Sequence, residues 1–207
     1  MKSADKEVHM APTYRWQLIV FSLLATVIAV PSLAGEPTEK IKQTTDQIIA
    51  IVTDPALKAR EREKDRKRLI RNVVDERFDW EEMSRRTLAR HWAKRTGEER
   101  KEFINLFGKL IERTYMDKVD DYSGEKVRFE GETVDGEYGT VNVRILTKKE
   151  TEIRVLYRVK KKGGDWYVYD ISIEGVSFIN NYRTQFNSII IRSSYENLVK
   201  RLRAKVE

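Results

Sequence analysis

Apolar residues recur at helical spacing in the first part of the chain that follows residue 35. Ile41, Ile48 and Val52 fall near one helical face and predict a helix that ends before Pro55. The next stretch, residues 56–78, predicts one long helix with a charged first half and an apolar stripe in its second half. Acidic and basic side chains alternate in the charged half. This half is therefore interpreted as a solvated helix face rather than a nucleic-acid-binding arm.

The stretch 97–122 predicts another long helix. Thr96 and Glu99 have the spacing of a capping box, and so do Asp79 and Glu82, which open a shorter helix. One broad face of the long helix is apolar and contains Phe103, Leu106, Phe107, Leu110, Ile111 and Tyr115. Taken singly, each of these residues is ordinary core.

After Ser123-Gly124 the apolar residues alternate in twos, which is the period of a β-strand. Four strands are predicted, within residues 126–131, 139–147, 151–160 and 165–175. The segment Lys162-Gly163-Gly164-Asp165 predicts a tight hairpin turn. One side of two neighbouring strands is apolar and contains Val141, Val143, Ile145, Ile153, Val155, Tyr157 and Val159.

Two further helices are predicted after the strands. The first follows Gly175, which we interpret as the turn from the last strand into a helix over the sheet, and the second begins at a Ser193–Glu196 capping box. The order of elements predicts an α+β fold, with a four-stranded antiparallel sheet packed against several helices. Such a sheet and its covering helices enclose either an apolar cavity or a filled core, and the pattern leaves both open.

The N-terminus predicts export. Arg15 precedes an uncharged run from Trp16 to Val30, and Ser32-Leu33-Ala34 resembles a cleavage site. We predict a secretory signal peptide over residues 1–34, a single domain over 35–207 and a periplasmic protein; a retained anchor and a start at Met10 are the alternatives. The run is shorter than the roughly 20 residues of a spanning helix.

Charge and cysteine content narrow the partners. The chain has no cysteine, which excludes a disulfide, a thiol nucleophile and a lipoprotein anchor. The net charge is +7, and removal of residues 1–34, with three basic and two acidic side chains, leaves +6. For an exported protein, that charge favours anionic lipid headgroups as neighbours and disfavours nucleic acid.

Candidate catalytic groups are weak. His91 is the one histidine of the predicted mature chain, so no histidine-based metal cluster is expected. Ser177 lacks the second glycine of a nucleophile elbow. Asp170 and Glu174 share one face of a strand, and a carboxylate pair of this kind is one arrangement for acid–base catalysis. The alternative is that Asp170 pairs with a base and Glu174 lies in a turn. We predict no enzyme activity, no metal and no cofactor.

The segment "WYVYDISIEGVSFINNYRTQF" resembles the MlaC or toluene-tolerance auxiliary family of periplasmic phospholipid-binding proteins. The resemblance rests on Trp166, Tyr169, Asp170, Glu174, Gly175, Ser177, Asn181, Tyr182, Arg183 and Phe186. Upstream it extends to Phe78, Met83, Trp92, Phe103, Phe107, Leu110 and Tyr115. Ala89-Arg90 departs from the Leu-Gly that members usually have there.

The resemblance implies a soluble carrier whose sheet and helices hold the acyl chains of a phospholipid. It implies an outer-membrane lipoprotein–porin complex and an inner-membrane ABC transporter, with its substrate-binding subunit, as partners. A related branch accompanies hopanoid pathways, so a hopanoid-associated lipid-binding protein is an alternative. A non-catalytic periplasmic adaptor with a filled core is another.

The candidate site follows from these expectations. We expect the cavity to be lined by Phe107, Leu110, Ile111, Tyr115, Val141, Val143, Val155, Tyr157, Phe178, Tyr182 and Phe186. We expect a structural corner made by Asp170, Glu174, Gly175, Asn181 and Arg183, in which Arg183 pairs with Asp170 or Glu174.

Overall fold

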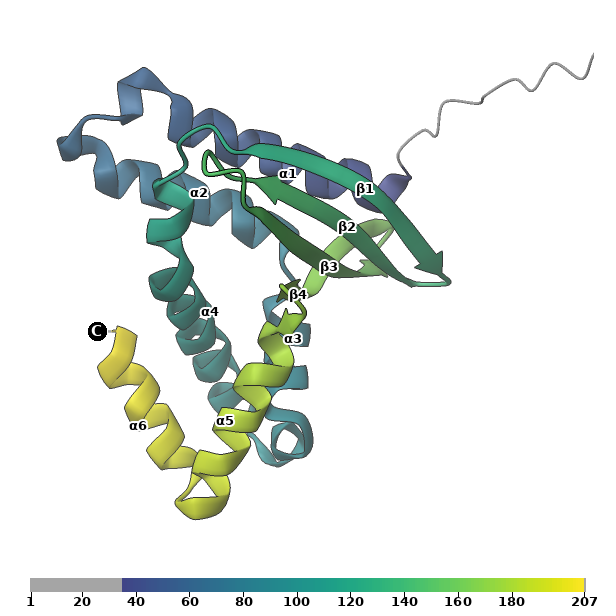
Figure 1. Ribbon diagram of the computed structural model, residues 1–207. Helices are drawn as coiled ribbons and strands as arrows, with labels where there is room; N and C mark the ends of the chain where they lie inside the picture. Colours follow the sequence, from purple (N-terminus) through teal and green to yellow (C-terminus); the bar gives the residue numbers. More distant parts are fainter. Residues whose placement is uncertain (1–34, 207) are drawn as a thin grey trace, which may run out of the picture. The chain divides into compact units, whose positions relative to one another are not determined.

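The computed structural model describes residues 35–206, and the predicted signal peptide lies outside them. Five antiparallel strands form one sheet in the order β1-β2-β3-β4-β5 (Figure 1). The four predicted strands are present, and the fifth corrects the prediction. The strand bounds are Lys126–Asp135 (β1), Tyr138–Leu146 (β2), Glu152–Lys162 (β3), Asp165–Ile173 (β4) and Val176–Ser177 (β5).

The short strand β5 explains the apparent corner after β4. Ser177 pairs with Ser172, and Val176 pairs with Ile173. The chain reverses through Glu174 and Gly175, whose φ angles of 48° and 80° are both positive. Glycine adopts such an angle without strain, so Gly175 suits this turn. Two residues are too few for strand periodicity to reveal, which is why the sequence predicted only a turn.

Six α-helices complete the part of the chain that the structure describes. The segment predicted as one long helix from residue 56 instead begins with two short 3₁₀ turns, Pro55–Leu57 and Arg60–Arg62. Ala59 between them is extended, with φ −59° and ψ 141°, and it interrupts the helix. The helix bounds are Glu36–Thr53 (α1), Glu63–Arg77 (α2), Trp80–Leu88 (α3), Gly97–Asp120 (α4), Phe178–Arg192 (α5) and Tyr195–Val206 (α6).

Side-chain caps fix several of these helix starts. The capping box of Thr96 and Glu99 is confirmed at the start of α4. The last helix differs from the prediction, because the hydroxyl of Ser194, not Ser193, accepts from the backbone N–H of Asn197 at 3.1 Å. These hydrogen bonds satisfy backbone donors that a helix leaves free at its N-terminus.

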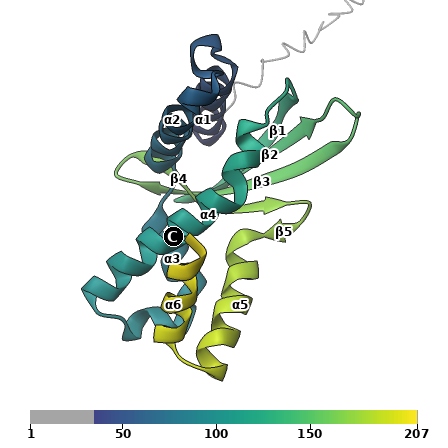
Figure 2. The same ribbon diagram turned by 90° about the vertical axis from the view of Figure 1, so that its left-hand side faces the viewer.

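The register aligns the apolar residues of adjacent strands on one face of the sheet. Val143 lies opposite Val155, and Ile145 lies opposite Ile153. Helix α1 packs against β1, β2 and β4 and against α2. Figure 2 shows α1 and α2 side by side at one end of the described domain and α3, α5 and α6 at the other end, with the sheet between them.

Two hydrophobic clusters hold these elements together. The larger cluster joins the sheet to α3, α4, α5 and α6, with Phe103 and Phe107 fully buried at its centre. The smaller cluster consists of Val52 of α1, Ile70 of α2 and Met116 of α4. Within residues 35–206, no helix is both long enough and apolar enough to span a membrane.

Candidate functional site

An apolar cavity of about 550 Å³ lies between the apolar face of the sheet and helices α1, α2 and α4. Its volume falls in the range of about 300–1,000 Å³ that is typical of ligand pockets. Aliphatic and aromatic side chains make up most of the wall. Helix α1 contributes Ile41, Ile48, Ile49 and Val52, helix α2 contributes Ile70 and Val74, and the strands contribute Val127, Ile145, Ile153, Val155, Ile171 and Ile173.

Five of the eleven residues that the sequence suggested as cavity lining do line it. They are Ile111 and Tyr115 of α4, Val155 and Tyr157 of β3, and Phe178 at the start of α5. The rings of Tyr115 and Phe178 stack with their centroids 4.5 Å apart, so α4 and α5 form one continuous wall here. Contact of these five residues with a ligand stays a prediction.

The other six expected residues do not line the cavity. Phe107, Tyr182 and Phe186 pack edge-on or tilted against one another, with ring centroids 5.4–6.0 Å apart. Their rings pack together between α4 and α5. Leu110 belongs to the same solid core, and α1 packs directly on the strand that carries Val141 and Val143.

Sequence reasoning missed the contribution of α1 and α2. Ile48 and Val52 of α1, with Ile70 and Val74 of α2, line the cavity opposite the sheet. The helical spacing of these residues showed that one side of each helix is buried. That spacing alone did not show that the buried side faces an open volume.

Polar side chains gather at the end of the cavity where α4 ends and β1 begins. This polar rim consists of Lys118, Asp121, Tyr122, Glu125 and Thr147. Lys118 and Asp121 are exposed, and the hydroxyl of Tyr122 donates to the backbone carbonyl of Glu125 at 3.0 Å. The backbone N–H of Ser123 lowers the pKa of Glu125. The rim is therefore the polar boundary of an otherwise apolar space.

Three ion pairs join α2 to α4 beside the cavity. Arg66 binds Asp120 through two N–H groups, one of them at 2.7 Å, and Lys67 lies 2.8 Å from Asp117. The hydrogen bonds from Arg66 lower the pKa of Asp120.

The third ion pair between α2 and α4 passes beside a glycine. Arg71 lies 2.6 Å from Glu112, and its guanidinium passes over Gly108. A Cβ at position 108 would lie 2.9 Å from that guanidinium, and a small shift of the flexible Arg71 side chain would relieve the contact. Together, the three ion pairs hold α2 beside α4 and so keep Ile70 and Val74 of α2 at the cavity wall.

The predicted corner exists, but with different partners. The carboxylate of Asp170 accepts from the hydroxyl of Ser177 at 2.7 Å, from the backbone N–H of Ile179 at 3.1 Å and from Arg158 at 3.1 Å. These bonds tie β4 to the first turn of α5 and use the carboxylate structurally. Asp170 pairs with a base, and Glu174 lies in the turn, as the alternative to acid–base work expected.

Arg183 does not take part in that corner as expected. Its guanidinium donates to the backbone carbonyl of Arg86 at 2.8 Å, and Glu174 pairs instead with Arg154 at 3.6 Å. Both predicted pairings of Arg183 are wrong because the side chain leaves α5 toward α3, away from the turn. Asn181 is exposed, and its side-chain oxygen accepts from Gln185, one helical turn along.

Two further observations concern possible metal ligands. Within residues 35–206, no three His, Cys, Asp or Glu side chains are grouped to hold a metal ion. His91 lies 2.9 Å from the side-chain oxygen of Asn187, which accounts for one ring nitrogen. The apolar cavity remains the principal candidate site.

Comparison with known proteins shows which family the chain belongs to. The sequence model of the MlaC protein family matches residues 42–204. The chain belongs to the MlaC family. A relative from Haemophilus influenzae, named the intermembrane phospholipid transport system binding protein MlaC, is 22% identical over 191 residues, covering 89% of each chain.

A solved structure supports the MlaC fold. It is the phospholipid-binding protein from Ralstonia solanacearum in complex with a phospholipid, 24% identical, with a TM-score of 0.74 over 83% of this chain and 97% of that one. The expectation of no enzyme activity agrees with membership of the MlaC family, because the curated relative is a transport-system binding protein.

Proposed function

We propose that this MlaC-family chain is a lipid carrier that holds the acyl chains of a phospholipid in the cavity between its sheet and α1, α2 and α4. The observation that carries the proposal is the apolar cavity of about 550 Å³, which has a group of five polar residues at one rim. A relative of the same fold forms a complex with a phospholipid. A filled-core adaptor would have no use for such a volume.

The energy of hydrocarbon transfer explains why a cavity is needed. A two-chain lipid has on the order of 30 methylenes, and burial of each is worth roughly 0.8 kcal/mol. Transfer of the lipid from a bilayer into water, with its chains uncovered, therefore costs about 20–25 kcal/mol. Spontaneous transfer over such a barrier is very slow. The cavity wall replaces the bilayer interior, and the polar rim leaves the headgroup in water.

The same proposal extends to transport. The chain shuttles phospholipid across the periplasm between an outer-membrane lipoprotein–porin complex and an inner-membrane ABC transporter with its substrate-binding subunit. The name of the Haemophilus influenzae relative, a binding protein of an intermembrane phospholipid transport system, supports this role. The signal-like run before Ala34 supports export and cleavage.

Native mass spectrometry of protein isolated from the periplasm tests the proposal. We expect a chain that starts near Gly35 and carries a non-covalent mass of about one phospholipid. Extraction then identifies the lipid, and a hopanoid mass would replace phospholipid as the ligand. Protein that remains empty, even after incubation with phospholipid vesicles, would favour the filled-core adaptor.

A further inference from the structure

Six charged side chains line the cavity, and three of them are neutralised by ion pairs. Arg71 and Glu112 lie 2.6 Å apart and pair with each other. Arg77 lies 3.2 Å from the carboxylate of Asp165 and also donates to the carbonyl of Trp166 at 2.6 Å. These three charges are therefore used within the protein.

Glu125 is the fourth charged side chain, and its own loop occupies it. Its two carboxylate oxygens accept from the backbone N–H and from the hydroxyl of Ser123, both at 2.8 Å. The hydrogen bond from the Ser123 backbone, and to a lesser extent the charge of Lys148, lowers the pKa of Glu125. The negative charge of Glu125 is thus already stabilised by the protein.

Lys118 and Asp121 are the remaining two charged side chains. They lie one helical turn apart at the end of α4, both on the polar rim and both exposed. The neighbouring Asp117 and Asp120 form ion pairs with α2, whereas within residues 35–206 Lys118 and Asp121 form none. The ammonium of Lys118 lies 5.7 Å from the centre of the Tyr115 ring, which is part of the cavity wall. One positive and one negative charge are therefore left without an ionic partner at the edge of an apolar cavity.

We propose that Lys118 and Asp121 recognise a zwitterionic headgroup, in which Lys118 binds the phosphate and Asp121 binds a primary ammonium, as in phosphatidylethanolamine. This inference rests on the proposed function. When the acyl chains fill the apolar cavity, the headgroup lies at the polar rim beside both side chains. Ethanolamine places its ammonium only two carbons from the phosphate ester, so one headgroup reaches both charges.

An anionic headgroup fits the same two side chains less well. The phosphate of phosphatidylglycerol finds a partner in Lys118, but its glycerol has no positive charge for Asp121. The phosphate also lies near the carboxylate of Asp121, and two negative charges repel each other. The rim therefore favours zwitterionic over anionic phospholipid when the acyl chains are the same.

A competition between two lipids tests this inference. Delipidated protein is incubated at low salt with mixed vesicles of equal amounts of palmitoyl-oleoyl phosphatidylethanolamine and palmitoyl-oleoyl phosphatidylglycerol, and native mass spectrometry measures the bound ratio. Because the acyl chains are identical, the ratio reports on the headgroup alone. We expect wild type to favour phosphatidylethanolamine roughly two- to fivefold, the value of one exposed ion pair.

Two variants separate the roles of the two side chains. Asp121→Asn removes the partner of the ammonium and should abolish the preference. Lys118→Gln removes the partner of the phosphate from both lipids, so it should bind each of them roughly two- to fivefold more weakly and still prefer phosphatidylethanolamine. A lysine that interacts only with the helix dipole would change stability and leave both lipid affinities unchanged.

Glu98→Gln is the matched control. It makes the same change of charge as Asp121→Asn, but at the other end of α4 and outside the cavity lining, so it should keep the wild-type ratio. The same ratio in wild type and Asp121→Asn, or wild-type affinity for both lipids in Lys118→Gln, overturns the inference while the carrier function stands. Binding of neither lipid by wild type overturns both.

Discussion

At the residue scale, Val155 distinguishes an open cavity from a filled core. It is 6% exposed and lines the cavity, whereas Val159 on the same strand is fully buried and does not line it. In Val155→Trp the indole should occupy ligand space, so lipid recovered per mole should fall sharply while the delipidated protein melts no lower than wild type. Thermal melting and lipid phosphorus measure the two effects.

Val159→Trp is the control for that substitution. Its neighbours fill the space around it, so overpacking should destabilise the protein by about 1–3 kcal/mol. The cavity assignment at Val155 fails if Val155→Trp melts well below wild type and still carries a full complement of lipid.

Glu82 makes the stability of the protein depend on acid pH. The carboxylate is buried at the start of α3 and accepts from Arg85 at 2.6 Å and from Arg86 at 2.7 Å. The hydrogen bond from Arg85, followed by that from Arg86, lowers its pKa from 4.5 to about 2 despite opposing burial. Because the folded-state pKa lies below the unfolded value, this stabilisation is complete above pH 4.5 and is lost as the pH falls toward 2.

Urea unfolding at a series of pH values measures this contribution. Wild type should lose stability steadily between pH 4.5 and pH 2, and Glu82→Gln should show a flatter dependence over that range. Glu81→Gln, an exposed neighbour on the same helix, should follow wild type. Equal slopes for wild type and Glu82→Gln would show that the buried carboxylate is not responsible.

At the element scale, Asp170 joins strand β4 to helix α5. Its carboxylate is 7% exposed and accepts from Ser177, Ile179 and Arg158. Asp170→Asn removes the charge and at least one of these bonds, so we expect a loss of about 1.5–3 kcal/mol in the free energy of unfolding.

Glu174→Gln is the control for this corner, because the 48% exposed Glu174 pairs with Arg154 on the surface, a pair worth about 0–1 kcal/mol. Chemical denaturation compares the two variants. Equal losses would mean that the buried network does not fix the junction of β4 and α5.

Periodicity predicted the elements better than it predicted the site. The alternation around Val143 and Val155 gave four strands and the apolar face, and the Thr96–Glu99 box located the start of α4. The pattern showed which side of α4 is buried. It did not show that Ile111 faces an open volume whereas Phe107 meets other rings, because that depends on neighbours distant in sequence.

The partners of Arg183 and the lining from α1 were missed for the same reason. A long side chain near a turn has several carboxylates within reach, and only the fold directs Arg183 to the carbonyl of Arg86. The stretch with Ile41, Ile48 and Val52 was correctly predicted to be helical, yet its position over the sheet is a tertiary property.

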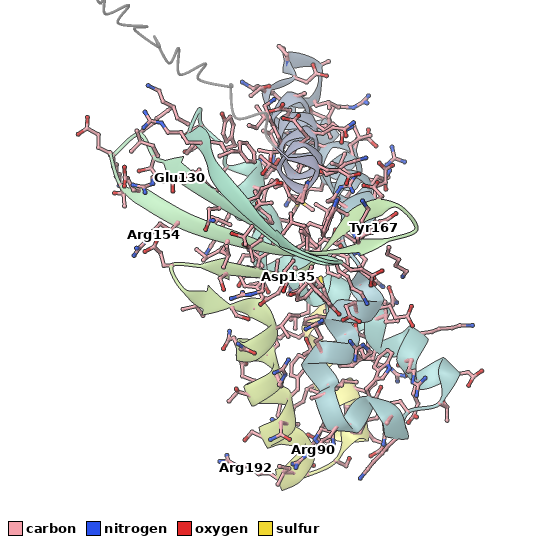
Figure 3. The ribbon with its side chains drawn as sticks, turned by 90° about the vertical axis from the view of Figure 1, so that its right-hand side faces the viewer. Arg90, Glu130, Asp135, Arg154, Tyr167 and Arg192 are labelled. Atoms are coloured by element: carbon pink, nitrogen blue, oxygen red, sulfur yellow. The ribbon has the colours of Figure 1, made fainter. Side chains whose placement is uncertain are left out.

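At the scale of the whole molecule, charge should govern encounter with membranes. The chain that follows residue 34 carries a net charge of +6. Figure 3 labels Arg192 at the end of α5 and Arg90, whose guanidinium donates to the side chain of Asn187 on the same helix. Raising the ionic strength should slow lipid pick-up from anionic vesicles more than it speeds the loss of bound lipid. Stopped-flow transfer of a fluorescent phospholipid measures both rates. Uncharged vesicles are the control, and an on-rate indifferent to salt would contradict electrostatic steering.

The central claim is that the acyl chains lie in the cavity between the sheet and α1, α2 and α4. Photo-crosslinking tests it most directly, using a phospholipid with a diazirine near the end of one acyl chain and mass spectrometry of the labelled peptides. We predict adducts on cavity-lining residues such as Ile48, Val74, Tyr115 and Ile145. Adducts confined to the surface of α6, or none in protein that still binds the lipid, would contradict the account.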